Sequence, residues 1–332
     1  MRKCLSFLLA AVLSLGTLCS AAVYVAAEEL EVTPEEISLE RINYAYLRVK
    51  GMNRIVCDYT AWKTDKMDQK IQSFNEALDG LQPHIPVYFY YVESSRSHPM
   101  KKEFPEESEL YLYLKKQLHT DMSDHLKYST FEEFCSYFYS TDHHWNYRGS
   151  YQGYVDIVHM LKGPEETVLV PAETVEFPVI YNGSFSEKTK TLLSDDLFTV
   201  YRFDGIPNYT AYVKGKKINY DRMKQYFAGK YGTGKLEPHY ARFYGGGYGE
   251  LLLKGESVGK GRLLVFEDSM SNAIKALLIN HYDEILFVDT RYYEKEQGKP
   301  CSISDILKYF PADQILILTC NTLFTDEHLL YP

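Results

Sequence analysis

The residues best suited to chemistry lie in one short stretch, Ser-Thr-Asp-His-His-Trp-Asn-Tyr-Arg at positions 140–148. An imidazole that acts as a general base needs a neighbour to fix its tautomer and stabilise its protonated form, and a carboxylate is the usual neighbour. If the segment is extended, Asp142 and His144 share one face because strand side chains alternate, and His143 points the other way. The spacing therefore predicts an Asp142–His144 pair that Trp145 shields from water, with His143 in a supporting role.

A serine that can complete this pair lies far downstream, in Phe-Glu-Asp-Ser at positions 266–269. The apolar residues before it predict a short buried strand, and Met270–His281 has apolar residues at helical spacing. Such a turn exposes a serine hydroxyl at the edge of a sheet, and N–H groups at the start of the helix can hold an oxyanion. Serine is also a preferred N-cap, so capping of the helix is the alternative role for Ser269. Asp268 is expected to cap the helix or shape the turn.

The Thr-Asp-His-His-Trp run, followed by Tyr147, Gly149 and Tyr151, resembles the DHHW family of bacterial surface proteins, and so does Ile-Leu-Phe-Val-Asp-Thr-Arg-Tyr-Tyr at positions 285–293. Through these motifs the chain is similar to the alginate O-acetylation proteins, which carry a circularly permuted SGNH-hydrolase-like fold. The resemblance implies that the Asp-x-His-Trp motif supplies acid and base, and that a later Gly-Asp-Ser-type motif supplies the nucleophile. Glu267 stands where the wider SGNH group has glycine. This departure bears on the oxyanion-hole geometry and on activity itself.

The hydrophobic pattern alternates between strands and helices. A hairpin is expected at 44–59, turning at Lys50-Gly51; helices at 64–81, 106–119, 149–161, 270–281 and 302–310; strands at 85–93, 263–266, 284–289 and 314–319; and a short helix plus strand at 128–138. Residues 163–261 lose helical periodicity and gain glycine and short alternating strands, which predicts a mostly β insertion. The expected fold class is α/β, a doubly wound and mostly parallel sheet in one domain over residues 28–332. The resemblance adds an SGNH-like fold with permuted motif order.

Residues 1–27 have the features of a targeting segment: Arg2 and Lys3, then an apolar stretch, then Val-Ala-Ala before Glu28. The segment is either a cleaved signal peptide or an uncleaved anchor, since the apolar run is just long enough to span a bilayer. Both alternatives place the rest of the chain outside the cytoplasm, secreted or anchored at the cell surface.

The net charge limits the kinds of partner, and the cysteine content limits the number of disulfide bonds. The net charge is −9 and no basic cluster follows the leader, so nucleic acid is not an expected partner. Four cysteines lie beyond the leader, at positions 57, 135, 301 and 320. They allow three pairings between which the sequence does not choose, and a core of this size predicts one disulfide or none.

Four further residues are candidates for contact with a substrate or an oxyanion. Asn182 lies in the Tyr-Asn-Gly-Ser loop and Gly246 in the triple-glycine loop at 245–247, and for both loops a plain turn is the alternative. Arg291 either holds a carboxylate within the fold or stabilises an anionic intermediate, and Tyr292 follows it.

These residues support an acyl-transfer mechanism. His144, oriented by Asp142, removes the proton of Ser269, and the serine attacks an acyl carbonyl to form an acyl-enzyme. Release to water makes an acetylesterase, and release to a sugar hydroxyl makes an O-acetyltransferase. The leader and the resemblance favour acetyl groups on a cell-surface or exported polysaccharide, or another acylated glycan. The resemblance alone implies a membrane acyl donor protein as a partner. No cofactor and no metal is expected.

Two other classes of function stay open. The first is a catalytically inactive protein of this fold that binds a glycan in the exopolysaccharide or cell-wall machinery, which Glu267 and the 30 tyrosines would fit. The second is a metallophosphoesterase, because Asp-His-His also occurs in a manganese-dependent family. That chemistry needs further carboxylate ligands, and no Asp-x-Asp motif stands near the early strands.

Overall fold

The computed structural model describes residues 37–59, 64–220, 222–256, 258–325 and 328–332. The predicted leader at 1–27 lies outside these residues. The chain divides into Met1–Glu36 and a second unit, Ile37–Pro332, and the description below concerns the second unit. In the described part of the chain, no helix has both the length and the apolar character needed to cross a membrane.

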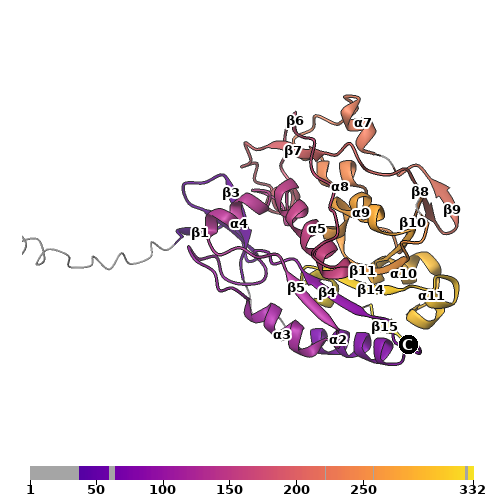
Figure 1. The fold of residues 1–332 in the computed structure, drawn as a ribbon. Coiled ribbons are helices and arrows are strands. Elements are labelled where there is room, and N and C mark those ends of the chain that lie inside the picture. The colour runs from indigo at the N-terminus through magenta and orange to yellow at the C-terminus, as the bar shows by residue number, and fades with distance from the viewer. Residues whose placement is uncertain (1–36, 60–63, 221, 257, 326–327) are drawn as a thin grey trace, which may run out of the picture. The chain divides into compact units, whose positions relative to one another are not determined.

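The centre of the fold is a mixed eight-stranded sheet (Figure 1). Its strands, in spatial order, are β5 (Met122–His125), β4 (Val87–Tyr91), β14 (Gln314–Thr319), β11 (Arg262–Glu267), β12 (Glu284–Val288), β10 (Glu250–Gly255), β8 (Tyr209–Val213) and β9 (Lys216–Ile218). The first five are mutually parallel, and the last three join by antiparallel pairing. The architecture is therefore mixed α/β, with a parallel half and an antiparallel extension.

The parallel strands are buried on both faces, as their nearly continuous apolar sequences predict. In β11, Val265 points into one apolar cluster while Leu264 and Phe266 point into the other. The second cluster is completed by residues of α2 (Thr64–Asp79), α3 (Glu109–Gln117), α10 (Thr290–Gln297) and α11 (Ile303–Tyr309); the first takes residues of α5 (Tyr147–Lys162). Helices thus cover both faces, and the carboxyl ends of the parallel strands are left as the edge where loops carry polar side chains.

Smaller elements surround the sheet. The predicted hairpin is confirmed as β2 (Tyr46–Val49) and β3 (Arg54–Cys57), with Gly51 in the turn at a φ of 79°, and β1 (Leu39–Arg41) adds a third strand. The remaining pairs and helices are β6 (Glu173–Ile180) with β7 (Leu197–Arg202), β13 (Cys301–Ser302) with β15 (Leu330–Tyr331), α4 (Phe131–Tyr137), α6 (Ser184–Thr189), α7 (Met223–Phe227), α8 (His239–Tyr244) and α12 (Thr322–Thr325). Cys57, Cys135, Cys301 and Cys320 are all free.

The range 163–261 is divided between two sheets. β6 and β7 pair with each other, whereas β8, β9 and β10 extend the main sheet. The strand expected after α4 is reduced to a single bridge between Phe138 and Trp145, and β5 was not expected. The candidates Arg291 and Tyr292 lie in the first turn of α10.

The single helix expected at 270–281 is wrong, because this stretch is broken into η1 (Ser269–Ala273), α9 (Lys275–Leu278) and η2 (Ile279–His281). Side chains compete here for carbonyl groups that a regular helix would use. Tyr240 Oη donates to the carbonyls of Ser269 and Met270 at 3.0 and 3.1 Å, and Trp145 Nε1 donates to Met270 O at 2.9 Å.

Candidate active site

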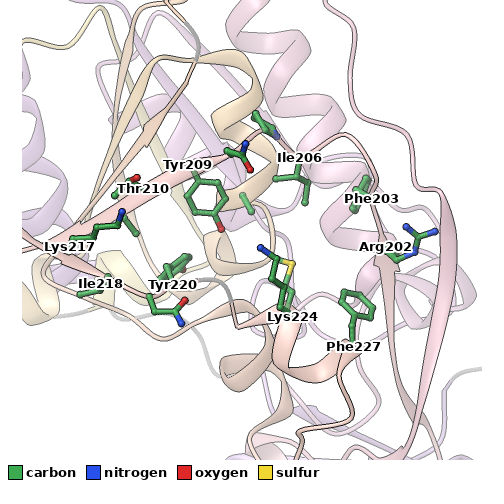
Figure 2. Close-up of a pocket in the computed structure, with 16 residues that line it drawn as sticks. Arg202, Phe203, Ile206, Tyr209, Thr210, Lys217, Ile218, Tyr220, Lys224 and Phe227 are labelled. Atoms are coloured by element: carbon green, nitrogen blue, oxygen red, sulfur yellow. The ribbon is translucent and has the colours of Figure 1, made fainter.

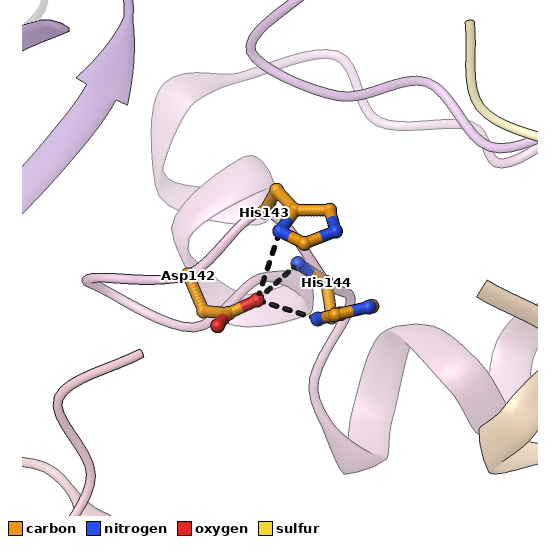
Figure 3. A group of neighbouring side chains, drawn as sticks. All are labelled: Asp142, His143 and His144. Carbon is orange, nitrogen blue, oxygen red and sulfur yellow. Dashed lines mark hydrogen bonds and ion pairs between the residues drawn. The ribbon is translucent and has the colours of Figure 1, made fainter. Parts of the chain in front are cut away.

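Asp142 and His144 meet in a turn. The main chain at Thr141–His144 is bent rather than extended, and Asp142 Oδ1 accepts from the backbone N–H of His144 at 2.9 Å and lies 2.6 Å from His144 Nδ1 (Figure 3). The expectation that His143 faces away from an extended strand is therefore wrong. His143 Nδ1 lies 3.3 Å from the same carboxylate oxygen.

The other oxygen of Asp142 is held by a loop 40 residues downstream. Asp142 Oδ2 accepts from Tyr181 Oη at 2.9 Å and from the Ser184 backbone N–H at 2.7 Å. Between these two donors lies Gly183, where a Cβ atom would stand 2.1 Å from Asp142 Oδ2, so a side chain has no room. Thr141 Oγ1 closes the arrangement by donating to Tyr181 O at 3.2 Å and accepting from Gly183 N at 3.1 Å.

This environment keeps Asp142 ionised. Burial alone would raise the pKa of the carboxyl group, but the imidazoles of His144 and His143 and the hydrogen bonds from His144 and Ser184 hold the pKa well below its ordinary value. An ionised carboxylate at Nδ1 selects the His144 tautomer that leaves Nε2 free to accept a proton.

Two rings fix the plane of the His144 imidazole, which is only 9% exposed. The ring of Tyr240 stacks on it with centroids 3.8 Å apart and an interplanar angle of 14°, and the His143 ring centroid is also 3.8 Å away. Burial, followed by the nearby His144, lowers the pKa of His143 well below its ordinary value, so His143 is neutral, and its Nδ1 lies 2.8 Å from Ser184 Oγ.

Ser269 completes the group from a segment 125 positions away, with its Oγ 2.8 Å from His144 Nε2. It lies two residues after the end of β11 and is half-buried. The N-cap of η1 is Asp268, whose Oδ1 accepts from Met270 N at 2.9 Å, so the capping role considered for Ser269 belongs to its neighbour. Asp268 Oδ2 also accepts from Thr319 Oγ1 at 2.6 Å and Cys320 N at 3.0 Å, which ties the turn to the end of β14.

Trp145 connects the segment that carries Asp142 and His144 with the segment that carries Ser269. Its ring is fully buried and its Nε1 donates to Met270 O at 2.9 Å, one residue beyond Ser269. On α5 the ring packs against Gly153, where a Cβ would lie 2.4 Å from the indole, so only glycine fits. Asp142, His144 and Ser269 therefore form a hydrogen-bonded chain whose backbone supports are also connected.

Glu267 has a partner that the sequence reasoning missed. Its Oε1 lies 2.6 Å from Lys275 Nζ, its Oε2 accepts from Ser271 Oγ, and both members of the ion pair are at most 2% exposed. Lys275 Nζ also donates to Asn272 Oδ1 at 2.8 Å. Burial raises the pKa of Glu267 to about 7, although Lys275 acts in the opposite direction. The glutamate thus belongs to a buried polar cluster formed by the end of β11, η1 and the start of α9.

The four further candidates come from two parts of the chain: Asn182 lies in the loop that holds Asp142, and the other three lie in the 245–247 loop and in α10, which contact each other. Arg291 binds Asp289 through two bonds of 2.8 and 2.6 Å, so it holds a carboxylate within the fold; burial opposes its charge, but Asp289 raises its pKa. Tyr292 packs against Gly247, while the Cβ position of Gly246 is open. Asn182 Oδ1 accepts from Ser186 Oγ at 3.2 Å and Ser194 N at 3.1 Å, so its carbonyl oxygen secures its own loop.

The sequence reasoning also missed Tyr240, Tyr181 and Ser184. Tyr181 and Ser184 flank the Asn-Gly pair that was singled out, so the predicted loop does reach the site, and these two neighbours of the pair are the residues that contact Asp142. Tyr240 lies 96 positions from His144 without any local motif, and only the tertiary fold brings it to the imidazole.

One cluster of side chains has the residue types of a metal site. Asp142, His143 and His144 are the one group in the described ranges whose ligand atoms lie close enough together, within 4.8 Å, to hold an ion. The group offers a single carboxylate, and its oxygens are already engaged by His144, Tyr181 and Ser184. A metallophosphoesterase needs further carboxylates, so these residues do not fit that reading.

The fold and site together define a mixed α/β protein with a Ser–His–Asp hydrogen-bonded chain at the carboxyl edge of its parallel strands. A DHHW family protein from Eubacterium siraeum DSM 15702 has a similar fold, with a TM-score of 0.62 and 18% identity over 90% of this chain and 100% of that one. PatB1 of Bacillus cereus, solved with a sulfonyl adduct, gives a TM-score of 0.64 and 17% identity over 87% of this chain and 98% of its own. These likenesses show a shared fold, as the sequence resemblance predicted. No family model and no curated protein matches the sequence.

Proposed function

We propose that this chain is an extracytoplasmic serine-dependent acyl ester enzyme, an O-acetyltransferase or acetylesterase that acts on a cell-surface or exported polysaccharide. The observation that carries the proposal is the hydrogen-bonded chain from Asp142 through His144 to Ser269, with bonds of 2.6 and 2.8 Å. A buried imidazole with an ionised acid on one nitrogen and a serine hydroxyl on the other is the arrangement that activates a serine nucleophile.

The proposed reaction has two halves. His144 Nε2 takes the proton of Ser269 Oγ as the oxygen attacks the acyl carbonyl, and Asp142 stabilises the imidazolium that results. The tetrahedral intermediate collapses when His144 returns the proton to the departing alkoxide, leaving the acyl group on Ser269. In the second half His144 takes a proton from water or from a sugar hydroxyl as its oxygen attacks the acyl-serine. The second tetrahedral intermediate then collapses, and His144 returns the proton to the departing Ser269 Oγ.

Three further points support the proposed location, substrate and reaction. The predicted leader favours action outside the cytoplasm. The resemblance to the DHHW family and the alginate O-acetylation proteins favours a polysaccharide acceptor, and it alone supports a membrane acyl donor as partner. PatB1, of similar fold, was solved with a sulfonyl adduct, and sulfonyl reagents are electrophiles that activated hydroxyl groups attack. Gly246, in the loop before β10, and Tyr292, in the first turn of α10, stay candidates for contact with the substrate. The proposed fold is the permuted SGNH-like one.

Hydrolysis of an aryl acetate tests the proposal. Wild type should show turnover, and Ser269→Ala should lower kcat by at least about a thousandfold, because the nucleophile is lost. Ser304→Ala, an exposed serine on α11, is the matched control and should leave the rate unchanged. Equal rates for Ser269→Ala and wild type would refute the proposal. Adding an acetylated donor with a glycan acceptor then separates acetyl transfer from release of acetate.

The alternative is a glycan-binding protein without catalysis, and Glu267 in the place of a glycine is the observation that favours it. The turn after β11 then serves stability alone. A folded wild-type protein that binds glycans but turns over no ester, and forms no adduct with a sulfonyl fluoride, would establish this alternative.

A further inference from the structure

A second site is indicated by a cavity of about 610 Å³ between the end of β7, the β8–β9 hairpin, α7 and α9 (Figure 2). Asp142, His144 and Ser269 are not among the residues that line it. Its volume is in the range of small-molecule sites, which is roughly 300–1,000 Å³. The proposed acyl-transfer chemistry leaves this cavity unexplained.

The walls combine aromatic rings with small polar groups. Figure 2 shows Tyr209 in the middle of the lining, with Lys217 on one side and Phe227 on the other. Phe227 is 41% exposed, an unusual state for a large apolar side chain, and Asn208 and Asn219 contribute amide groups nearby. Sugars have one apolar ring face and hydroxyl groups around the rim, so they fit walls of this composition.

The charges on the lining residues favour a negatively charged ligand. The side chain of Lys217 is exposed and makes no ion pair or hydrogen bond with any residue in the described ranges. Arg202, at the other end, is already engaged by Glu173 and Asp204. None of the described lining residues is acidic, although the whole chain carries a net charge of −9. Lys217 is therefore an unpaired cation beside an aromatic surface on an otherwise acidic protein.

We propose that this cavity binds an acidic sugar unit, whose ring packs on the aromatic wall and whose carboxylate pairs with Lys217. The cavity is linked to the candidate active site through a short series of contacts. Tyr220 Oη on its wall donates to Tyr244 O at 3.2 Å, the Tyr244 ring lies 5.1 Å from that of Tyr240, and Tyr240 stacks on His144.

Holding one unit of a polymer here raises the effective concentration of neighbouring units near Ser269. That role as a substrate subsite rests on the proposed function, whereas binding itself does not.

Calorimetry with tetragalacturonate on the full chain tests binding without requiring turnover. Wild type should bind, and Lys217→Glu should weaken the affinity by about tenfold or more, because a charge-assisted contact becomes a repulsion. Lys216→Glu is the matched control: it makes the same charge change on β9, but Lys216 does not line the cavity. Its affinity should stay within about twofold of wild type.

Two further measurements make the test specific. Cellotetraose, a neutral sugar of the same length, should bind more weakly than tetragalacturonate, and Phe227→Ala should weaken binding of both, with thermal melts to establish that the variant is folded. No binding of tetragalacturonate by wild type, or equal losses for Lys217→Glu and Lys216→Glu, would overturn the proposal. A chain that binds but shows no esterase activity would contradict the proposed function while leaving the sugar site standing.

Discussion

Replacing Gly183 by alanine tests how strictly the site depends on the position of Asp142. A Cβ on residue 183 would lie 2.1 Å from Asp142 Oδ2, 2.4 Å from its Cβ and 2.6 Å from its Cγ, whereas ordinary contact begins near 3.4 Å. The carboxylate or the loop must therefore shift by roughly 1.3 Å, the difference between those two distances. A shift of that size breaks the 2.6 Å contact between Asp142 Oδ1 and His144 Nδ1.

The expected result is a folded protein with a badly oriented imidazole. A misplacement of about 1 Å lowers rates by roughly a hundredfold, which corresponds to about 2.7 kcal/mol in the activation free energy. Aryl acetate hydrolysis measures kcat, and circular dichroism with a thermal melt reports the fold. The loss should appear in kcat rather than KM, because Gly183 makes its contact with the acid and not with the acyl group.

Gly80→Ala is the matched control for this change. Gly80 follows α2, and its Cβ would meet only backbone oxygens at 3.6 and 3.9 Å, which is ordinary contact. That variant should keep the wild-type kcat. If folded Gly183→Ala turned over substrate within about twofold of wild type, the reasoning that Asp142 must be held in place by this loop would be refuted.

Three further changes test other parts of the structure. Trp145→Phe loses the 2.9 Å bond to the Met270 carbonyl and part of a buried ring, so urea unfolding should show a loss of about 2 kcal/mol; unchanged stability would contradict the bridging role. Glu267→Gly leaves the buried Lys275 without its partner and should cost about 3–5 kcal/mol, most of which Lys275→Met in the same chain should recover. Glu93 is buried, its Oε2 accepts no hydrogen bond within the described residues, and burial raises its pKa to about 7 in the folded protein. The native state therefore holds the Glu93 proton more tightly than the unfolded chain does. The resulting gain in the free energy of unfolding is complete below about pH 4.5 and is lost as the pH rises to about 7. Glu93→Gln should therefore flatten the fall in stability between these pH values and stabilise the protein at pH 8, and unfolding curves with unchanged pH dependence would contradict this.

The parts of the fold that the sequence predicted well are those set by local patterns. The strands around residues 87–91, 262–267, 284–288 and 314–319 are runs of apolar residues, and such runs indicate burial on both faces without knowledge of their partners. The antiparallel extension could not be predicted, because the alternating pattern of β8 and β10 does not say which sheet they join. The division of the expected 270–281 helix into three short segments could not be predicted from the sequence either. It arises because the side chains of Tyr240 and Trp145 bind carbonyl groups that a regular helix would use.

The same division holds for the candidate site. Asp142, His144 and Ser269 were recognisable by residue type and spacing, and the structure brings them within hydrogen-bonding distance, while their catalytic role stays a prediction. Tyr181, Ser184 and Tyr240 carry no motif, because their contacts depend on loops that approach only in three dimensions. Glu267 raised the question of activity from sequence alone, but its ion pair with Lys275, eight residues later at the start of α9, could not be predicted from the sequence.

Trapping the acyl-enzyme tests the central claim most directly. The wild-type protein is mixed with an activated aryl acetate, quenched in acid, digested and examined by mass spectrometry. The account predicts one acetyl group on Ser269, absent in Ser269→Ala and strongly reduced in His144→Ala. Acetyl groups spread over surface lysines, or identical labelling of wild type and His144→Ala, would show that the hydroxyl is not activated by this imidazole and would contradict the account.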